Sequence, residues 1–199
     1  MFNFIKGCNI KNPEGVAEGY KKYNENSLAA NVSAENIKDV FGHFIVMHEE
    51  PMFFILELPV ESDKEKTVSP GVVEEFHKDV YYIDGCSAEE CIYLLETYGE
   101  LLINDGLCSF GFGCHNSGDE IMLGKYNFIS IYSKNLAAFE GFFEAHKIEN
   151  NDNLVFAGSV ISRDNPGTSE TLTVDGLRIY DLPKRLKDWN IYLAETRAE

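Results

Sequence analysis

The sequence predicts an α+β fold, a mainly antiparallel sheet with helices packed on it. Short apolar runs alternate with clusters of turn-forming residues, which is typical of hairpins. The pair Asp175-Gly176 between TLTV and LRIY is the signature of a type I′ hairpin. Ser87 and Glu90 form a capping box ahead of apolar residues at helical spacing. The Gly-rich turn that joins strand to helix in dinucleotide-binding βαβ units is absent, which disfavours a parallel sheet.

The chain has 199 residues, 44% of them hydrophobic, which suits one globular domain spanning residues 1–199. Residues 13–25 have a weak helical pattern, and a stronger one begins at Ser33. An alternative is that residues 1–48 form a helical N-terminal appendage to that domain.

The other elements follow from periodicity and turn signals. We expect three hairpins, formed by 44–48 with 52–58, by 107–113 with 121–132, and by 171–174 with 177–180. Single strands are expected at 80–84 and 153–162, an exposed loop at 59–72, and helices at 88–102 and 136–146. A last helix is expected at 181–193, with Leu186, Trp189 and Leu193 facing inward.

The stretch 101–133 organises the rest. In its first strand, Phe110 and Phe112 share a core face, whereas the opposite face carries Gly111 and Gly113. A face so nearly bare lets a helix, an aromatic ring or a ligand lie directly on the backbone. We therefore expect the two glycines to be closely covered.

The formal net charge is −16, and most of the excess falls in residues 49–120, which hold 17 acidic and three basic side chains. This field repels nucleic acid and anionic membranes and attracts cationic partners. We expect a basic protein partner, no nucleic acid and no membrane, although solubility alone also explains such a charge. The carboxylates assigned to binding are Glu49, Glu50, Glu74, Glu75 and Glu89.

The N-terminus lacks the features of a secretion signal, so we expect a cytoplasmic protein with five reduced cysteines. No pair of cysteines or histidines has the close spacing of zinc ligands, and Gly111-Phe112-Gly113 with Gly118 does not match a nucleotide-binding fingerprint. We expect neither metal nor cofactor. His115 as a general base with Glu120 as its partner is the only catalytic alternative that the residues suggest.

Small size, acidity, an α+β pattern and the lack of a catalytic motif make the chain similar in type to bacterial immunity proteins, which neutralise basic toxin domains. The likeness is one of general character and not of particular residues. The first hypothesis is therefore a non-enzymatic protein that binds a basic partner, as an immunity protein or antitoxin does. The second is a small-molecule enzyme or ligand-binding protein with its site at the Gly-rich hairpin loop 111–120. A third is a self-associating protein without a small-molecule ligand.

Overall fold

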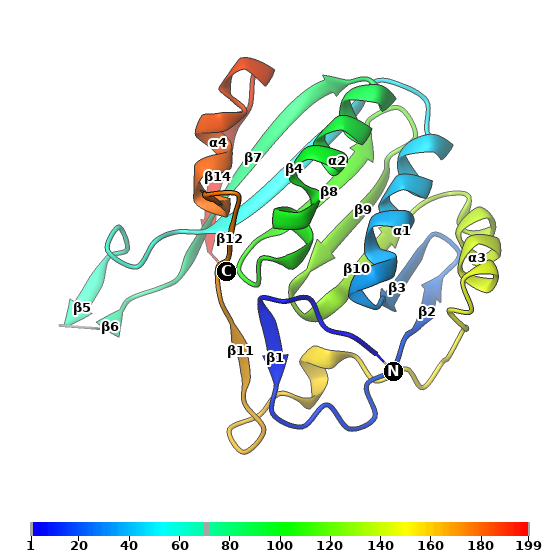
Figure 1. Cartoon of the computed structure of the whole chain (residues 1–199), viewed down its shortest axis with the longest axis horizontal. Helices are drawn as coiled ribbons and strands as arrows, with labels where there is room; N and C mark the ends of the chain where they lie inside the picture. Colours follow the sequence, from blue (N-terminus) through cyan, green and yellow to red (C-terminus); the bar gives the residue numbers. More distant parts are fainter. Residues whose placement is uncertain (1, 70–71, 199) are drawn as a thin grey trace.

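The structure is a computed structural model that describes residues 2–69 and 72–198. It confirms the predicted α+β class, as one domain with helices packed on a large antiparallel sheet (Figure 1). Within the described residues no helix has the length and apolar character needed to cross a membrane.

The main sheet has eight strands in the order β14-β7-β4-β8-β9-β10-β3-β2, and every neighbouring pair is antiparallel. The strands are β2 (Gly19–Asn24), β3 (Ser27–Asn31), β4 (Met52–Pro59), β7 (His77–Cys86), β8 (Ser109–Cys114), β9 (Asp119–Gly124), β10 (Phe128–Tyr132) and β14 (Tyr192–Ala198). Strand β4 lies inside the sheet between β7 and β8, which suits its continuous apolar sequence.

Helices α1 (Ala34–Met47) and α2 (Ala88–Asn104) lie side by side across one face of the sheet (Figure 1). The Phe41 ring of α1 stacks on Phe110 of β8 with 4.8 Å between ring centroids, and both side chains are fully buried. Ser87 and Glu90 form the predicted capping box of α2. The main core therefore fills the space between these two helices and the sheet.

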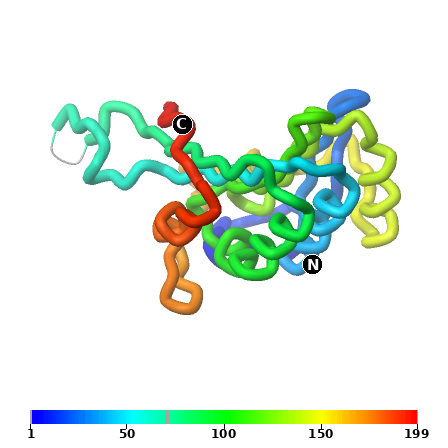
Figure 2. The backbone as a smooth tube through the Cα atoms, turned by 90° about the horizontal axis from the view of Figure 1, so that it is seen from above, coloured from blue at the N-terminus to red at the C-terminus, as the bar shows by residue number. Residues whose placement is uncertain are grey.

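Smaller elements surround this body. Helix α3 (Leu136–Ala145) packs beside β2, where Phe143 stacks on Tyr20 at 5.1 Å. A two-stranded arm projects away from the body, as Figure 2 shows from above. The remaining elements are β1 (Cys8–Ile10) with β11 (Gly167–Ser169), the arm strands β5 (Thr67–Ser69) and β6 (Val72–Val73), β12 (Thr173–Val174) with β13 (Leu177–Arg178), α4 (Leu182–Arg185), and the 3₁₀ turns η1 (Lys125–Asn127), η2 (Ala157–Val160), η3 (Ile179–Asp181) and η4 (Lys187–Trp189).

Several local predictions near the N-terminus are wrong. The segment 13–25 contains strand β2 instead of a helix, and residues 1–48 are not an appendage because β2 and β3 belong to the main sheet. Residues 44–47 continue α1 instead of forming a strand. Phe44 and Ile45 extend the same buried stripe as Phe41, so tertiary packing favours the helix.

Three later predictions also need correction. The predicted strand 121–132 is interrupted at η1, where Tyr126 and Asn127 have left-handed backbones, so β9 and β10 form a hairpin. The predicted strand at 153–162 contains the 3₁₀ turn η2. The predicted last helix ends at Asn190, whose φ of 58° terminates the helical run before β14 begins. Leu193 is consequently half exposed on a strand instead of buried on a helix.

Candidate functional site

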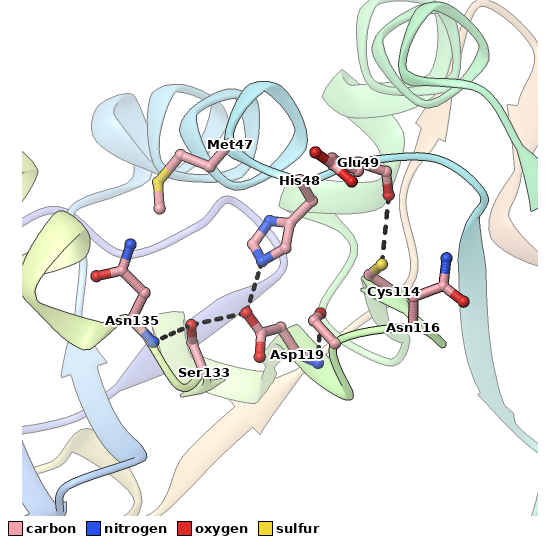
Figure 3. A pocket seen from close by; sticks show the side chains of 9 residues that line it. Met47, His48, Glu49, Cys114, Asn116, Asp119, Ser133 and Asn135 are labelled. Atoms are coloured by element: carbon pink, nitrogen blue, oxygen red, sulfur yellow. Dashed lines mark hydrogen bonds and ion pairs between the residues drawn. The ribbon is translucent and has the colours of Figure 1, made fainter.

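A pocket of about 430 Å³ lies where the C-terminal end of α1 meets the turn between β8 and β9 (Figure 3). This is the helix-covered side of the loop that the second hypothesis proposes as a ligand site. The pocket is lined by Met47, His48, Glu49, Cys114, Asn116, Ser117, Asp119, Ser133 and Asn135.

A hydrogen-bonded network with Asp119 at its centre forms the floor of this pocket. The Asp119 carboxylate accepts from His48 Nε2 at 2.8 Å, from Ser133 Oγ at 2.8 Å and from the Lys134 amide at 3.2 Å. Burial acts to raise the pKa of Asp119, but the bonds from His48, Ser133 and Lys134 outweigh burial and lower it. The group is therefore held as a carboxylate.

The His48 ring has no nitrogen free for proton transfer. Its Nδ1 donates to the Phe44 carbonyl at 2.7 Å, while Nε2 donates to the carboxylate of Asp119. Both ring nitrogens are therefore engaged by an oxygen atom, which fixes the orientation of the ring. Both side chains are only 7% exposed.

Histidine, aspartate, serine and cysteine meet here without forming a nucleophile–base pair. The Ser133 hydroxyl donates to Asp119 and not to His48, so the order of a Ser-His-Asp triad is not present. The Cys114 thiol donates to the Glu49 carbonyl at 3.3 Å. A Ser-His or Cys-His pair needs a histidine nitrogen that faces the nucleophile, and the two His48 nitrogens bond instead to Phe44 and Asp119. The network ties the end of α1 to the β8–β9 and β10 strands.

His115 and Glu120, the predicted catalytic pair, belong to the opposite face of the sheet. His115 Nε2 bonds with Asp84 Oδ1 at 3.0 Å, so its acidic partner is Asp84 and not Glu120. Glu120 is half-buried, and burial together with the nearby Glu57 carboxylate raises its pKa. The structure therefore does not support the base–acid pairing inferred from sequence proximity.

The glycine-bearing face of β8 is covered as predicted, but by side chains of neighbouring strands. A Cβ on Gly113 would fall 2.1 Å from the Phe53 ring, and one on Gly111 would fall 2.2 Å from the Ile121 carbonyl oxygen and 2.3 Å from Met122 Sδ. An aromatic ring and a thioether thus occupy the space that a ligand would need.

Phe53 belongs to a row of rings that crosses this face. Its centroid lies 4.6 Å from that of His115 and 5.6 Å from that of Tyr82, which stacks on Tyr192 at 6.3 Å. Asp84 accepts from both ends of the row, from His115 and from the Tyr192 hydroxyl at 2.5 Å. The bonds from Tyr192 and His115 lower the pKa of Asp84.

The five carboxylates assigned to binding lie in two separate places. Glu49, Glu50 and Glu89 surround the N-terminus of α2, where Glu50 accepts from the Ala88 amide at 2.6 Å. Glu74 and Glu75 follow β6 on the projecting arm, at the opposite end of the molecule (Figure 1). All five are exposed, but they do not form one patch.

Next to Glu50 and Glu89, the end of β7, the first turn of α2 and the η4 turn border a hollow of about 380 Å³. Its lining includes Asp84, whose carboxylate also bonds to His115 and Tyr192, the acidic residues Glu90 and Asp188, and the half-buried Trp189. We call this region the acidic end, defined by Glu49, Glu50, Asp84, Glu89, Glu90 and Asp188. The sequence did not indicate it, because Asp84 and Asp188 are far apart in the chain.

The buried carboxylate of Glu57, outside the acidic end, is paired with cationic side chains. Glu57 is 8% exposed and forms ion pairs with Lys78, at 2.6 Å, and with Arg197. In contrast, the described residues supply no lysine or arginine to any carboxylate of the acidic end. Asp84 bonds instead to His115 and Tyr192, and Glu50 and Glu90 accept from the Ala88 and Ser87 amides at the start of α2. The region therefore keeps a net negative charge toward solvent.

All five cysteines are free and buried. Burial raises the pKa of Cys108 well above its usual value, and its thiol donates to the Leu102 carbonyl at 3.4 Å. In the part of the chain that the structure describes, no three histidine, cysteine, aspartate or glutamate side chains are grouped to hold a metal ion.

Comparison of the chain with protein-family models, with curated proteins and with solved structures finds no match.

Proposed function

We propose that the protein is a non-enzymatic, acidic protein-binding protein that engages a basic partner through the acidic end, in the manner of an immunity protein or antitoxin. The observation that carries the proposal is the hollow between the α2 N-terminus and η4, where Asp84, Glu90 and Asp188 surround a cavity beside Trp189. A lysine or arginine side chain is the complementary guest for such a set of groups.

Two interactions favour a guanidinium guest. Carboxylates accept charge-assisted hydrogen bonds from arginine, and these are stronger than bonds between neutral groups. An indole ring attracts a cation placed over its face. Trp189 is held in place by stacking on Tyr93, with centroids 5.4 Å apart and ring planes 16° from parallel. The ring is thus fixed before a partner arrives.

The surrounding charge adds steering. Glu49, Glu50 and Glu89 are exposed around the same helix end, so a basic surface is attracted before contact. Glu74 and Glu75 are placed too far away to belong to this contact surface, and each lies near a basic side chain, Lys66 and His77 respectively. The proposal therefore replaces these two residues with Asp84, Glu90 and Asp188.

The binding test uses an arginine-rich peptide as the probe and isothermal titration calorimetry as the readout. The acidic-end variant carries Glu49→Gln, Glu89→Gln and Asp188→Asn. A control variant with the same charge change carries Glu14→Gln, Glu25→Gln and Asp152→Asn, which are exposed residues elsewhere. We expect the acidic-end variant to lose most of its affinity for the peptide and the control variant to keep it. Equal losses in the two variants would mean that the acidic charge serves solubility and not binding.

The pocket beside His48 supports a second proposal, a small-molecule ligand bound at the β8–β9 loop. Its volume of about 430 Å³ is within the range of known ligand pockets, and its lining combines apolar surface with polar groups such as Asn116 and Asn135. Native mass spectrometry of the purified protein separates the two proposals, because a retained small molecule favours this pocket and an accompanying basic protein favours the acidic end.

A further inference from the structure

Strand β14 leaves one edge of the main sheet open. It is the first strand in the sheet order, and β7 is its only partner strand among residues 2–69 and 72–198. All seven of its residues are exposed. Among the described residues, no backbone hydrogen bond joins the outer edge of Tyr192–Ala198 to another segment. A row of unpaired amides and carbonyls is a template for a further strand.

The other edge of the same sheet is protected. The amide of Tyr20 in β2 donates to the Glu149 carbonyl at 3.0 Å, and the amide of Asn151 donates to the Tyr20 carbonyl at 2.8 Å. The segment after α3 thus covers the middle of β2, whereas β14 has no such cover. The contrast makes β14 the edge on which strand addition can occur.

The sequence of β14 does little to prevent pairing. YLAETRA contains no proline, glycine or lysine, the residues that commonly protect an edge. Tyr192 and Leu193 are 47% and 50% exposed, so the edge also offers apolar surface. A bulge between Leu193 and Glu195 affects the pairing with β7, and the run from Glu195 to Ala198 is regular.

We propose that β14 pairs antiparallel with β14 of a second copy of this chain, joining two sheets across a two-fold axis at Thr196. In this register Glu195 of each copy lies directly opposite Arg197 of the other. Opposite charges in directly facing positions stabilise an antiparallel pair. A two-fold axis repeats the contact, so the dimer gains two such pairs.

The side chains are already placed for this contact. Within one chain Arg197 Nη1 lies 3.0 Å from Glu195 Oε1, so both groups project from the same face of the strand. Both remain about half exposed. The guanidinium has five donors and also binds Glu57, so it can bridge its own chain and the second copy.

The test is sedimentation velocity over a wide range of concentration. Wild-type protein is expected to show a concentration-dependent monomer–dimer equilibrium. Glu195→Arg places Arg opposite Arg, and Arg197→Glu places Glu opposite Glu. For each variant alone, the dimer dissociation constant should rise by at least about tenfold. An equimolar mixture of the two should restore dimers, because every facing pair is then oppositely charged.

Controls keep the outcome clear. Arg197→Glu also removes a partner of the buried Glu57, so its fold is checked by circular dichroism. Glu195→Arg changes an exposed side chain whose ion-pair partner is Arg197, and it tests the proposal alone if the other variant is unfolded. Glu25→Arg, the same charge change on an exposed turn, should dimerise as wild type does.

The proposal is overturned if the wild-type protein is monomeric at every concentration. The edge would then be available to a strand of another protein. A dimer that Glu195→Arg leaves unchanged overturns the proposal as well. These results do not depend on the acidic end, since neither Glu195 nor Arg197 belongs to it.

Discussion

Replacing Asp119 with alanine removes the acceptor at the centre of the buried network beside α1. The change leaves His48 Nε2 and the Ser133 hydroxyl without their partner, and each was bonded at 2.8 Å. An orphaned buried hydrogen-bonding group costs about 1–3 kcal/mol, and this change orphans two such side chains and the Lys134 amide. Both members of the pair are 7% exposed, so solvent offers little compensation. We expect the free energy of unfolding to fall by about 3–5 kcal/mol.

Urea denaturation followed by circular dichroism measures this change. Asp119→Asn keeps one acceptor oxygen but no charge, and it should fall between alanine and wild type. Asp152→Ala, an exposed aspartate, serves as the control and should stay within about 0.5 kcal/mol of wild type. A loss below about 1 kcal/mol for Asp119→Ala would refute the view that this network holds the end of α1 on the sheet.

The pH dependence of stability gives the same prediction a second readout. The folded-state pKa of Asp119 lies below its usual value, so the unfolded chain takes up the proton first as pH falls. Its contribution is therefore complete above the unfolded pKa of about 3.9 and is lost as pH falls through the lower folded value. Asp119→Asn should remove this part of the acid sensitivity, and an unchanged acid profile would contradict the assignment.

Other predictions test the packing, the thiols and the charge. Gly111→Ala should lower the free energy of unfolding by about 1–3 kcal/mol, and by more than Gly113→Ala does. The added Cβ of Gly111→Ala meets the fixed Ile121 carbonyl oxygen, whereas that of Gly113→Ala meets the movable Phe53 ring. A larger loss for Gly113→Ala in urea denaturation would be inconsistent with this packing. Cys108 should react slowly with a thiol reagent in the native protein, because burial both covers it and raises its pKa; reaction at the rate of unfolded protein would disprove this. The melting temperature should rise between low and physiological ionic strength, since salt screens the self-repulsion of a −16 chain over about 8 Å; a flat response would contradict it.

The sequence predicted those elements that local chemistry determines. The capping box at Ser87 and Glu90 begins α2, and Asp175 and Gly176 have the positive φ angles that a type I′ turn requires. Strand β14 was missed because Leu, Ala, Glu and Arg favour helices, and pairing with β7 overrides that preference. The extension of α1 through Phe44 was missed because FIVMH also fits a short strand.

The candidate sites depended on contacts that no spacing reveals. His48 and Asp119 are 71 positions apart, and His115 and Asp84 are 31 apart. The sequence placed His115 and Glu120 close together along the chain, but strand geometry gives His115 a partner on a different strand. The net charge of residues 49–120 could not show where its glutamates lie, because the path of the chain divides them between the start of α2 and the arm.

Fluorescence of Trp189, the only tryptophan of the chain, tests the proposed binding at the acidic end most directly. The ring lines the hollow with Glu90 and Asp188, so a bound guanidinium must change its emission. We predict a saturable change on titration with an arginine-rich peptide, none with the same peptide carrying neutral citrulline, and a much weaker response in the acidic-end variant. An unchanged spectrum, or equal affinity in that variant, would contradict the proposal.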